Sequence, residues 1–357
     1  MQFYFVIFFV VAVSAYMELQ YKPKKSILYL LSAVFFVLGF LRWENGTDWD
    51  SYLFMFETFE YNDYWLIEPL YSIILVFARH LTHHYTFALL FFSLILFYFQ
   101  TKGLHKISVL PVVSLFALVG MSFANVFFVR QTIAQAILLF SIYYIQQRKL
   151  FSFLLCILFA MGFHNSSIIF VPAYWLFTLD LSKKQILIFT FASIFLSNVV
   201  ETFLGNIANG LGENILYKIN NYVIEKHEDD NTSLSVFEMT IKAIANRFVF
   251  YVIGFYLYDK VKNDNTFKYF KSFFVLYVVG TILFFMLNPI SNVLSRACRY
   301  YDIAQIFLIS YFFAYQIKRK NVSIFFIILL LFLGLKLYIY ITGYDCFIPY
   351  NWTPLLR

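Results

Sequence analysis

The stretch SILYLLSAVFFVLGFL, residues 26–41, holds no charged side chain and decides the fold class. Such a run suits a helix that crosses the hydrocarbon core of a bilayer, which is about 30 Å thick. Similar apolar runs recur along the whole chain of 357 residues, which is 61% hydrophobic and 13% charged. A soluble domain carries roughly 25% charged residues, so the composition indicates an integral membrane protein.

The apolar residues come in unbroken runs and not in alternation, which excludes a transmembrane β-barrel. We therefore predict an all-α, polytopic bundle of about 11–13 transmembrane helices. No long polar block interrupts the runs, so we expect a single membrane-embedded domain over residues 1–357. Several candidate spans are shorter than usual, among them 150–163, 166–179 and 300–316.

Clusters of lysine predict the orientation, since cytoplasmic loops carry an excess of Lys and Arg. The clusters at 22–25, 147–149, 182–184, 259–271 and 318–320 are assigned to the cytoplasm. Between residues 66 and 123 the sequence has one candidate span more than the orientation of the flanking segments allows. Either 66–80, which is short, or 108–123, which Pro111 and Gly120 interrupt, does not cross the membrane.

The same orientation predicts which segments face the outer side. These are the loops 42–65, 205–237 and 289–299 and the C-terminal tail 342–357. The net charge of +7 reflects the cytoplasmic anchors, so no nucleic-acid partner is expected.

Lysine and arginine are distributed differently. Fourteen of the 18 lysines fall in segments assigned to the cytoplasm if Lys102 and Lys106 are counted inside, but of the nine arginines only Arg148 and Arg319 do. Outer-face arginine opposes the orientation rule, so another requirement should place it there. A guanidinium group binds phosphate oxygens with paired hydrogen bonds, which predicts an anionic-ligand site. The alternative is that each arginine extends to the interface or pairs with an acid. The arginines concerned are Arg42, Arg130, Arg247, Arg296 and Arg299.

His164 lies between two apolar segments, in MGFHNSSIIFVP, residues 161–172. A neutral imidazole is suited to accept a proton from a hydroxyl nucleophile, so His164 is a candidate general base. The alternative is a histidine satisfied by the carbonyls at a helix end or by Ser166 and Ser167.

Three acids have two interpretations each. Asp48 follows Gly46 in RWENGTDWD, residues 42–50, and either caps a helix or contacts sugar hydroxyls. Glu44, in the same stretch, is a candidate sugar contact or base. Glu68, beside Pro69, is either an acid of a first helical turn or a functional carboxylate in the membrane.

No metal or cofactor is predicted. The three cysteines have no metal-ligand spacing. His80, His83 and His84 lie in a stretch without carboxylates between Glu68 and Lys102, so a metal site there is not expected.

Several stretches resemble a known family. LRWENGTDWDSYLFMFE at 41–57 is similar to the arginine, G-T-D, tyrosine and phenylalanine signature of the EpsG-like, Wzy-type polysaccharide polymerases. FVRQTIAQAILLF at 128–140, FHNS at 163–166, SRACRYYDIAQI at 295–306 and FIPYNW at 347–352 follow in the family's order. The matching residues are Arg42 and Asp48, then Arg130, His164, Arg296 and Arg299.

The resemblance implies a polymerase of O-antigen or a related surface glycan in the bacterial inner membrane, with its active site facing the periplasm. The fold is expected to resemble the multispanning, lipid-donor (GT-C-like) glycosyltransferases. The expected partners are undecaprenyl-diphosphate-linked donor and acceptor oligosaccharides, membrane lipid and a protein that regulates chain length. Transfer is expected to invert the anomeric centre without a metal.

The proposed roles combine the residues with the resemblance. Arg130, Arg296 and Arg299, with Arg42 or Arg247, would bind the donor diphosphate. His164 would take the acceptor proton, with Asp48 or Glu44 as alternative base or sugar contact.

Three other activities share these features. A flippase or transporter also has arginines in the membrane, but it predicts internal repeats and polar residues in both halves of the membrane. A membrane acyltransferase also needs a histidine, but its site should open to the cytoplasm. An O-antigen ligase uses the same donor chemistry and is the closest alternative.

Overall fold

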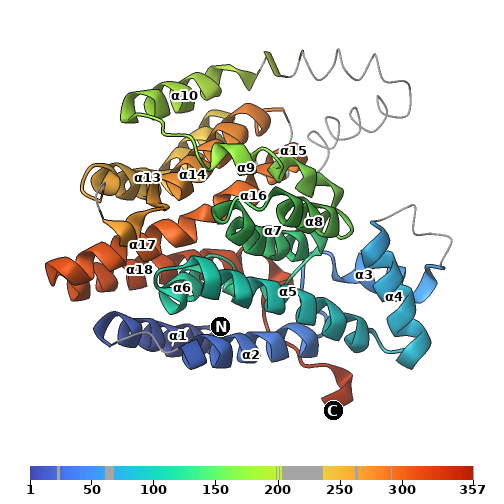
Figure 1. Cartoon of the computed structure of the whole chain (residues 1–357). Coiled ribbons are helices and arrows are strands. Elements are labelled where there is room, and N and C mark those ends of the chain that lie inside the picture. The colour runs from blue at the N-terminus through green and yellow to red at the C-terminus, as the bar shows by residue number, and fades with distance from the viewer. Residues whose placement is uncertain are drawn as a thin grey trace. The chain divides into compact units, whose positions relative to one another are not determined.

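The computed structural model describes residues 1–21, 25–60, 68–197, 199–200, 202, 236–261, 264–290 and 292–356. Every regular element in these ranges is a helix (Figure 1), and the one β-type pairing there is an isolated bridge between Arg42 and Trp352. The predicted all-α class is confirmed. Residues 205–235, most of the predicted 205–237 loop, lie outside the described residues.

Five helical stretches within these ranges are long and apolar enough to cross a membrane. Four further helical stretches are apolar but shorter, which confirms a polytopic helical membrane protein. A helix of 12 residues is only about 18 Å long, less than the thickness of the hydrocarbon core. The predicted total of about 11–13 spans stays a prediction. The five are α1 (Gln2–Gln20), α5 (Tyr85–Ile107), Thr240–Tyr258 of α13 (Val236–Tyr258), Asn265–Leu287 with α14 (Phe270–Leu287), and α18 (Val322–Thr342). The shorter four are α2 (Lys25–Leu41), α4 (Pro69–Thr82), Pro111–Asn125 with α6 (Pro111–Ser122), and α8 (Leu150–Met161).

Two predicted spans do not form one straight helix. Segment 166–179 divides into a 3-10 helix, Asn165–Phe170, and the short α9, Ala173–Leu176. Segment 300–316 divides between α16 (Arg299–Asp302) and α17 (Ala304–Arg319). Apolar composition does not distinguish a broken segment from a continuous helix, which explains the difference.

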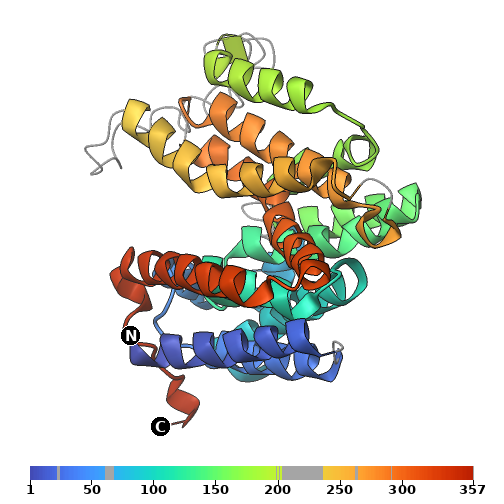
Figure 2. The same cartoon turned by 90° about the vertical axis from the view of Figure 1, so that its left-hand side faces the viewer.

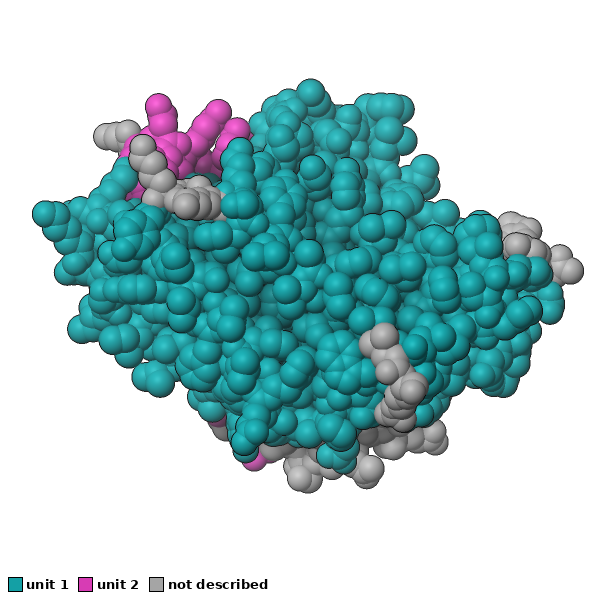
Figure 3. Space-filling view, turned by 90° about the horizontal axis from the view of Figure 1, so that it is seen from below, with its two compact units in different colours: residues 1–171, 309–357 teal, residues 172–308 magenta. Residues whose placement is uncertain are grey.

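The chain divides into two compact units (Figure 3). Unit 1 comprises Met1–Val171 and Ile309–Arg357, and unit 2 comprises Pro172–Leu308. The single domain predicted from the sequence stays a prediction.

In unit 1, α6 lies along most of α1. The carboxylate of Glu18, near the end of α1, accepts the backbone N–H of Val113 at 2.9 Å. At the other end of α6 the ring of Phe123 packs on Tyr4, with centroids 4.9 Å apart. Glu18 and Tyr4 are roughly 21 Å apart along the helix, so segment 108–123 runs most of the length of the bundle. Figures 1 and 2 show α1 and α2 along one side of unit 1, against α6 and α5.

Helix α4 forms a hairpin with α5 and packs on the first part of that helix. Tyr71 stacks on Phe92 with centroids 4.4 Å apart, and Phe77 lies 5.7 Å from Phe91. Helix α5 continues to Ile107. That either 66–80 or 108–123 does not cross the membrane stays a prediction.

In unit 2, lysines of two predicted cytoplasmic clusters lie at the same end. Lys183, which begins α10 (Lys183–Phe195), pairs with Asp259 at 2.6 Å. Lys271, in the first turn of α14, pairs with Asp180 at 2.8 Å and lies over the ring of Tyr258. The two clusters thus lie at one end of unit 2, as expected if both face the same side of the membrane.

Candidate functional site

Three helix ends of unit 1 bring polar side chains together. Glu68 is the N-cap residue of α4 and precedes Pro69. Arg130 is the first residue of α7 (Arg130–Gln146), and His164 follows α8 as the N-cap residue of the 3-10 helix Asn165–Phe170. These residues are far apart in the sequence, and the helix packing of α4, α7 and α8 joins them.

The carboxylate of Glu68 is the centre of the cluster. Its Oε2 accepts a hydrogen bond from Arg130 Nη1 at 2.5 Å. Its Oε1 lies 2.9 Å from His164 Nδ1 and accepts the backbone N–H of Asn165 at 3.2 Å. The Glu68 side chain is 7% exposed, so a buried carboxylate receives hydrogen bonds from a guanidinium, an imidazole and an amide.

This environment keeps Glu68 ionised. Burial raises the pKa of the carboxyl group, but the hydrogen bond from His164 and the charge of Arg130 outweigh it and lower the pKa from 4.5 to about 2. An ionised carboxylate can only accept hydrogen bonds, which assigns the shared proton to His164 Nδ1. When the imidazole is neutral, the other ring nitrogen, Nε2, is an acceptor and can take up a proton.

His164 is open on its other side. Its side chain is 29% exposed, and within the described residues the bond from Nδ1 to Glu68 is the only hydrogen bond of its ring. A carboxylate that fixes the tautomer of an imidazole whose second nitrogen is accessible is the arrangement of a general base. The observed partner of the His164 side chain is Glu68. The assignment of His164 as a base stays a prediction.

Gly162 holds the end of α8 against the start of α4. Its carbonyl oxygen accepts the N–H groups of Leu70 and Tyr71 at 3.0 and 3.3 Å, two donors that the first turn of a helix cannot satisfy itself. A Cβ atom on Gly162 would lie 2.3 Å from Leu70 Cδ1. Glycine thus permits the close approach that brings Glu68 to His164.

Arg130 lies between two tyrosine rings. Its Cζ atom is 5.8 Å from the ring centroids of both Tyr52, on α3 (Trp49–Thr58), and Tyr71, on α4. Both distances allow a cation–π contact. The Nε atom of Arg130 is buried and has no hydrogen-bond partner among the described residues. The guanidinium is therefore held by Glu68 on one side and lies against the two tyrosine rings.

Asp48 lies at the start of α3, the helix that carries Tyr52. It occupies the N-cap position without a capping hydrogen bond from its side chain. Its exposed carboxylate accepts the hydroxyl of Tyr52 at 3.4 Å. Asp48 is thus the N-cap residue by position, without a side-chain capping bond, and its contact with a sugar stays a prediction.

Glu44 and Arg42 lie in the preceding loop with different exposure. Glu44 is exposed, has a positive φ of 54°, and accepts the indole N–H of Trp43 at 3.2 Å. Arg42 is only 3% exposed. Its Nη1 donates to the carbonyl of Asn45 at 2.8 Å and its Nη2 to that of Phe128 at 3.0 Å. The predicted diphosphate contact of Arg42 stays a prediction, and the bonds observed here connect parts of the chain.

The loop that contains Arg42 is joined to the C-terminal tail. Trp43 N–H donates to Asn351 O, and Thr353 N–H donates to Leu41 O. The buried amide of Asn45 donates to the carbonyls of Cys346 and Pro349, both at 2.9 Å. The two motifs RWENGTD and FIPYNW therefore form one local structure, although some 300 residues separate them.

The remaining predicted arginines lie in unit 2. Arg247, on α13, donates to Asp302 Oδ2 at 3.0 Å and lies 4.1 Å from the ring centroid of Phe284. Arg296 and Arg299 are exposed, in the 3-10 helix Arg296–Cys298 and at the start of α16. The structure thus brings Arg130 and His164 together in unit 1, and Arg247 into an ion pair in unit 2.

The sequence did not identify two acids as site residues. Glu68 was recognised as either a helix-start acid or a functional carboxylate, and nothing in its neighbours decides between them. Asp302, in SRACRYYDIAQI, is the acid that Arg247 pairs with. The signal for both was available: an arginine within an apolar protein requires an acid close by in space.

No group of three or more His, Cys, Asp or Glu side chains in the described part of the chain is arranged to hold a metal ion. The comparisons with curated proteins and with solved structures find no match. The model of the EpsG family matches residues 26–352, which include the loop at 42–48, the Glu68, Arg130 and His164 cluster, and the arginines of unit 2. The chain therefore belongs to the EpsG family.

Proposed function

We propose that this protein is a polysaccharide polymerase that lengthens a lipid-linked glycan by inverting transfer. Membership of the EpsG family supports a polymerase-like membrane protein of polysaccharide synthesis. The observation that carries the proposal is the carboxylate–imidazole–guanidinium cluster of Glu68, His164 and Arg130. It combines a base for a hydroxyl group with a cation for a phosphate group.

The proposed donor is a glycan chain on undecaprenyl diphosphate, and the acceptor is the terminal sugar of a new lipid-linked repeat unit. His164 Nε2 takes the proton of the acceptor hydroxyl while its oxygen attacks the anomeric carbon. The bond between that carbon and the diphosphate oxygen breaks, and the electron pair leaves with the diphosphate. Glu68 stabilises the imidazolium that forms, which later releases its proton to water.

The charged groups of the cluster have complementary roles. Arg130 holds Glu68 through Nη1, and its remaining donors stabilise the negative charge of the departing diphosphate. The exposed carboxylates of Asp48 and Glu44 accept hydrogen bonds from sugar hydroxyls. Arg42 holds the loop that contains both acids. The step as written requires no cofactor.

We place the protein in the bacterial inner membrane with the cluster toward the periplasm. The support is the orientation predicted from lysine, together with the position of His164 and Arg130 at helix ends away from the cytoplasmic clusters. A protein that regulates chain length is the proposed partner.

Arg296 and Arg299 are proposed to bind lipid diphosphate in unit 2, because they are exposed cations within an apolar protein. Replacing both by Gln should lower kcat/KM for the lipid-linked donor about 10- to 100-fold, since a hydrogen bond to a charged group contributes about 1.5–3 kcal/mol. The change should lie mainly in KM, measured with purified protein in nanodiscs.

The matched control removes two cations of unit 2 at its lysine-rich end, Lys183→Gln with Lys260→Gln. Equal losses in both double variants would show that net charge, and not a diphosphate site, is responsible. An unchanged KM for Arg296→Gln with Arg299→Gln would reject the assignment.

The surface glycans of a deletion strain test the proposed function against its alternatives. A polymerase mutant should carry single-repeat glycans, and the restored gene should return the full ladder. Polymer that accumulates on undecaprenyl would indicate a ligase. Repeat units that accumulate on the cytoplasmic side would indicate a flippase, and intact chains lacking an acyl group would indicate an acyltransferase.

A further inference from the structure

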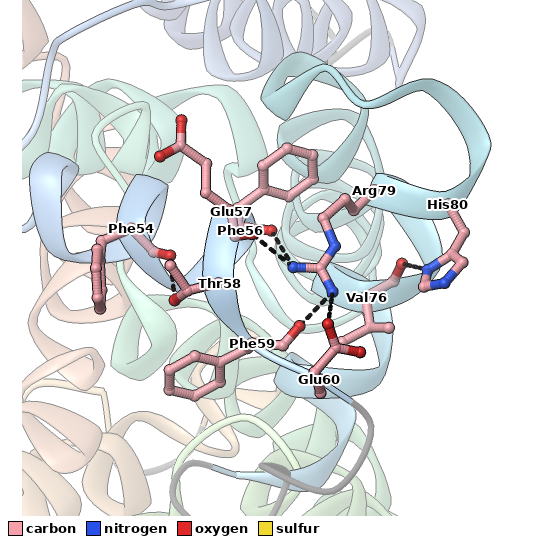
Figure 4. A network of polar contacts seen from close by, with 9 residues as sticks. All are labelled: Phe54, Phe56, Glu57, Thr58, Phe59, Glu60, Val76, Arg79 and His80. Carbon is pink, nitrogen blue, oxygen red and sulfur yellow. Dashed lines mark hydrogen bonds and ion pairs between the residues drawn. The ribbon is translucent and has the colours of Figure 1, made fainter.

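Arg79, near the end of α4, donates to the end of α3 through both terminal nitrogens (Figure 4). Its Nη1 donates to the carbonyl oxygens of Phe56 and Glu57 at 3.2 and 2.8 Å. Its Nη2 donates to the carbonyl oxygen of Phe59 and lies 3.5 Å from the carboxylate of Glu60. The Arg79 side chain is 14% exposed, so these contacts are largely shielded from water.

The carbonyl groups concerned are those that a helix leaves without partners. The last four C=O groups of an α-helix have no donor within it, and the end of the helix dipole there attracts a cation. Helix α3 has 10 residues, from Trp49 to Thr58, and a helix of that length is marginal on its own. Arg79 therefore stabilises α3 and fixes it to α4.

Helix α3 carries groups that reach Arg130. The ring of Tyr52 lies against the guanidinium of Arg130 and packs on Tyr71 of α4, with centroids 5.4 Å apart. Asp48, at the start of α3, accepts the hydroxyl of Tyr52. The position of α3 on α4 thus determines which groups face Arg130 on the side away from Glu68.

Arg79 itself is too distant to act on a substrate held at His164. Eleven residues of helix separate it from Glu68, which corresponds to roughly 16 Å. Its functional contribution must therefore pass through α3.

We infer that Arg79 is a positioning residue that fixes α3 on α4 and thereby places Tyr52, the hydrogen-bond partner of Asp48, against Arg130. The functional part of this inference rests on the proposed polymerase reaction. The structural part does not, because the position of α3 can be measured without turnover.

Three variants test the inference in purified, nanodisc-reconstituted protein. Arg79→Ala removes all the donors. Arg79→Lys keeps the charge but not the planar fork that reaches several carbonyls. Arg319→Ala is the control, because Arg319 Nε donates to the Tyr315 hydroxyl on its own helix. Arg79→Ala should lower kcat about 10- to 100-fold with little change in KM, since displacement by about 1 Å has effects of that size. The kcat of Arg79→Lys should fall between those of Arg79→Ala and the parent protein, and the kcat of Arg319→Ala should match that of the parent.

Hydrogen exchange separates a local effect from unfolding. In Arg79→Ala the amides of residues 52–58 should exchange faster, while those of α7 and α8 keep the parent rate. Faster exchange throughout the chain, or no change in α3, would overturn the positioning role. If the parent protein polymerises nothing, but Arg79→Ala still loosens α3 locally, the structural inference is upheld and the proposed reaction is rejected.

A double-mutant cycle with Tyr52→Leu tests the route. If Arg79 acts through Tyr52, the double variant should be little worse than the more damaged single variant. Multiplied losses in kcat would show that Arg79 acts by another route and would overturn the inference.

Discussion

Replacing His164 with alanine should abolish chain growth and leave single-repeat glycans. The variant removes the base that accepts the acceptor's proton, a contribution of roughly 10²- to 10⁴-fold in rate. The effect should appear in kcat and not in the binding of the lipid-linked glycan donor. The reason is that the His164 ring contacts Glu68 and not an arginine proposed to bind the diphosphate. The measurement is the glycan ladder of a complemented deletion strain, together with turnover by purified protein.

His105→Ala is the matched control for this variant. His105 lies in the last turn of α5, and its ring is 5.6 Å from that of Tyr29. The control should keep the full ladder at equal protein abundance. Long chains made by His164→Ala would remove His164 from the mechanism.

Glu68→Gln should cause the second-largest loss, about 10- to 1000-fold in kcat. The amide keeps the shape of the carboxylate but not its charge, so it no longer stabilises the imidazolium, and its NH₂ group faces a donor of Arg130. Activity should fall, and so should Tm, because removing one partner of a buried ion pair costs about 3–5 kcal/mol. Arg130 is 24% exposed, so about 1–3 kcal/mol is expected here.

Glu60→Gln offers a matched control, since Glu60 also contacts an arginine, Arg79, but is 71% exposed. Its effect on Tm should be near zero, because exposed ion pairs contribute about 0–1 kcal/mol. Equal effects of Glu68→Gln and Glu60→Gln would contradict a buried role for Glu68.

The pH dependence of this difference has a definite sign. The pKa of Glu68 is lowered from 4.5 to about 2 on folding, so its stabilisation is complete above pH 4.5 and is lost as the pH falls toward 2. The difference in Tm between the parent protein and Glu68→Gln should therefore be constant from pH 5 to 8, as far as Glu68 itself is concerned. A difference that changed with pH within this range in the His164→Ala background, where no imidazole titrates beside Glu68, would show that Glu68 is not held ionised.

Gly162→Ala tests the position of Glu68 without changing any charge. A Cβ atom would meet Leu70 at 2.3 Å and displace the start of α4 from the end of α8. Activity should fall in the same direction as for Glu68→Gln. A fully active Gly162→Ala protein would show that the separation of Glu68 and His164 is not critical.

The sequence predicted the features that composition and residue type determine. Apolar runs predicted the helical membrane fold, and the distribution of arginine singled out Arg130 before its partner was known. His164 was recognised because imidazole is the usual base near neutral pH. These inferences need no knowledge of which helices pack together.

The sequence could not predict features that depend on helix packing. Glu68 is 62 residues from Arg130 and 96 from His164, and only the contact of α4 with α7 and α8 makes it their partner. Arg42 and Arg130 are the same residue type, but their environments differ. Arg42 is buried and donates to two carbonyl groups, whereas Arg130 pairs with Glu68.

The central claim is that this protein joins lipid-linked repeat units with His164, oriented by Glu68, as the base. The most direct measurement supplies purified protein in nanodiscs with a lipid-linked repeat unit of the native glycan and follows both glycan length and released undecaprenyl diphosphate. We predict products of two or more repeats from the parent protein, with one diphosphate lipid released for each new bond, and neither from His164→Ala. Failure of the parent protein to extend its native repeat unit, or extension by His164→Ala at the parent rate, would contradict the account.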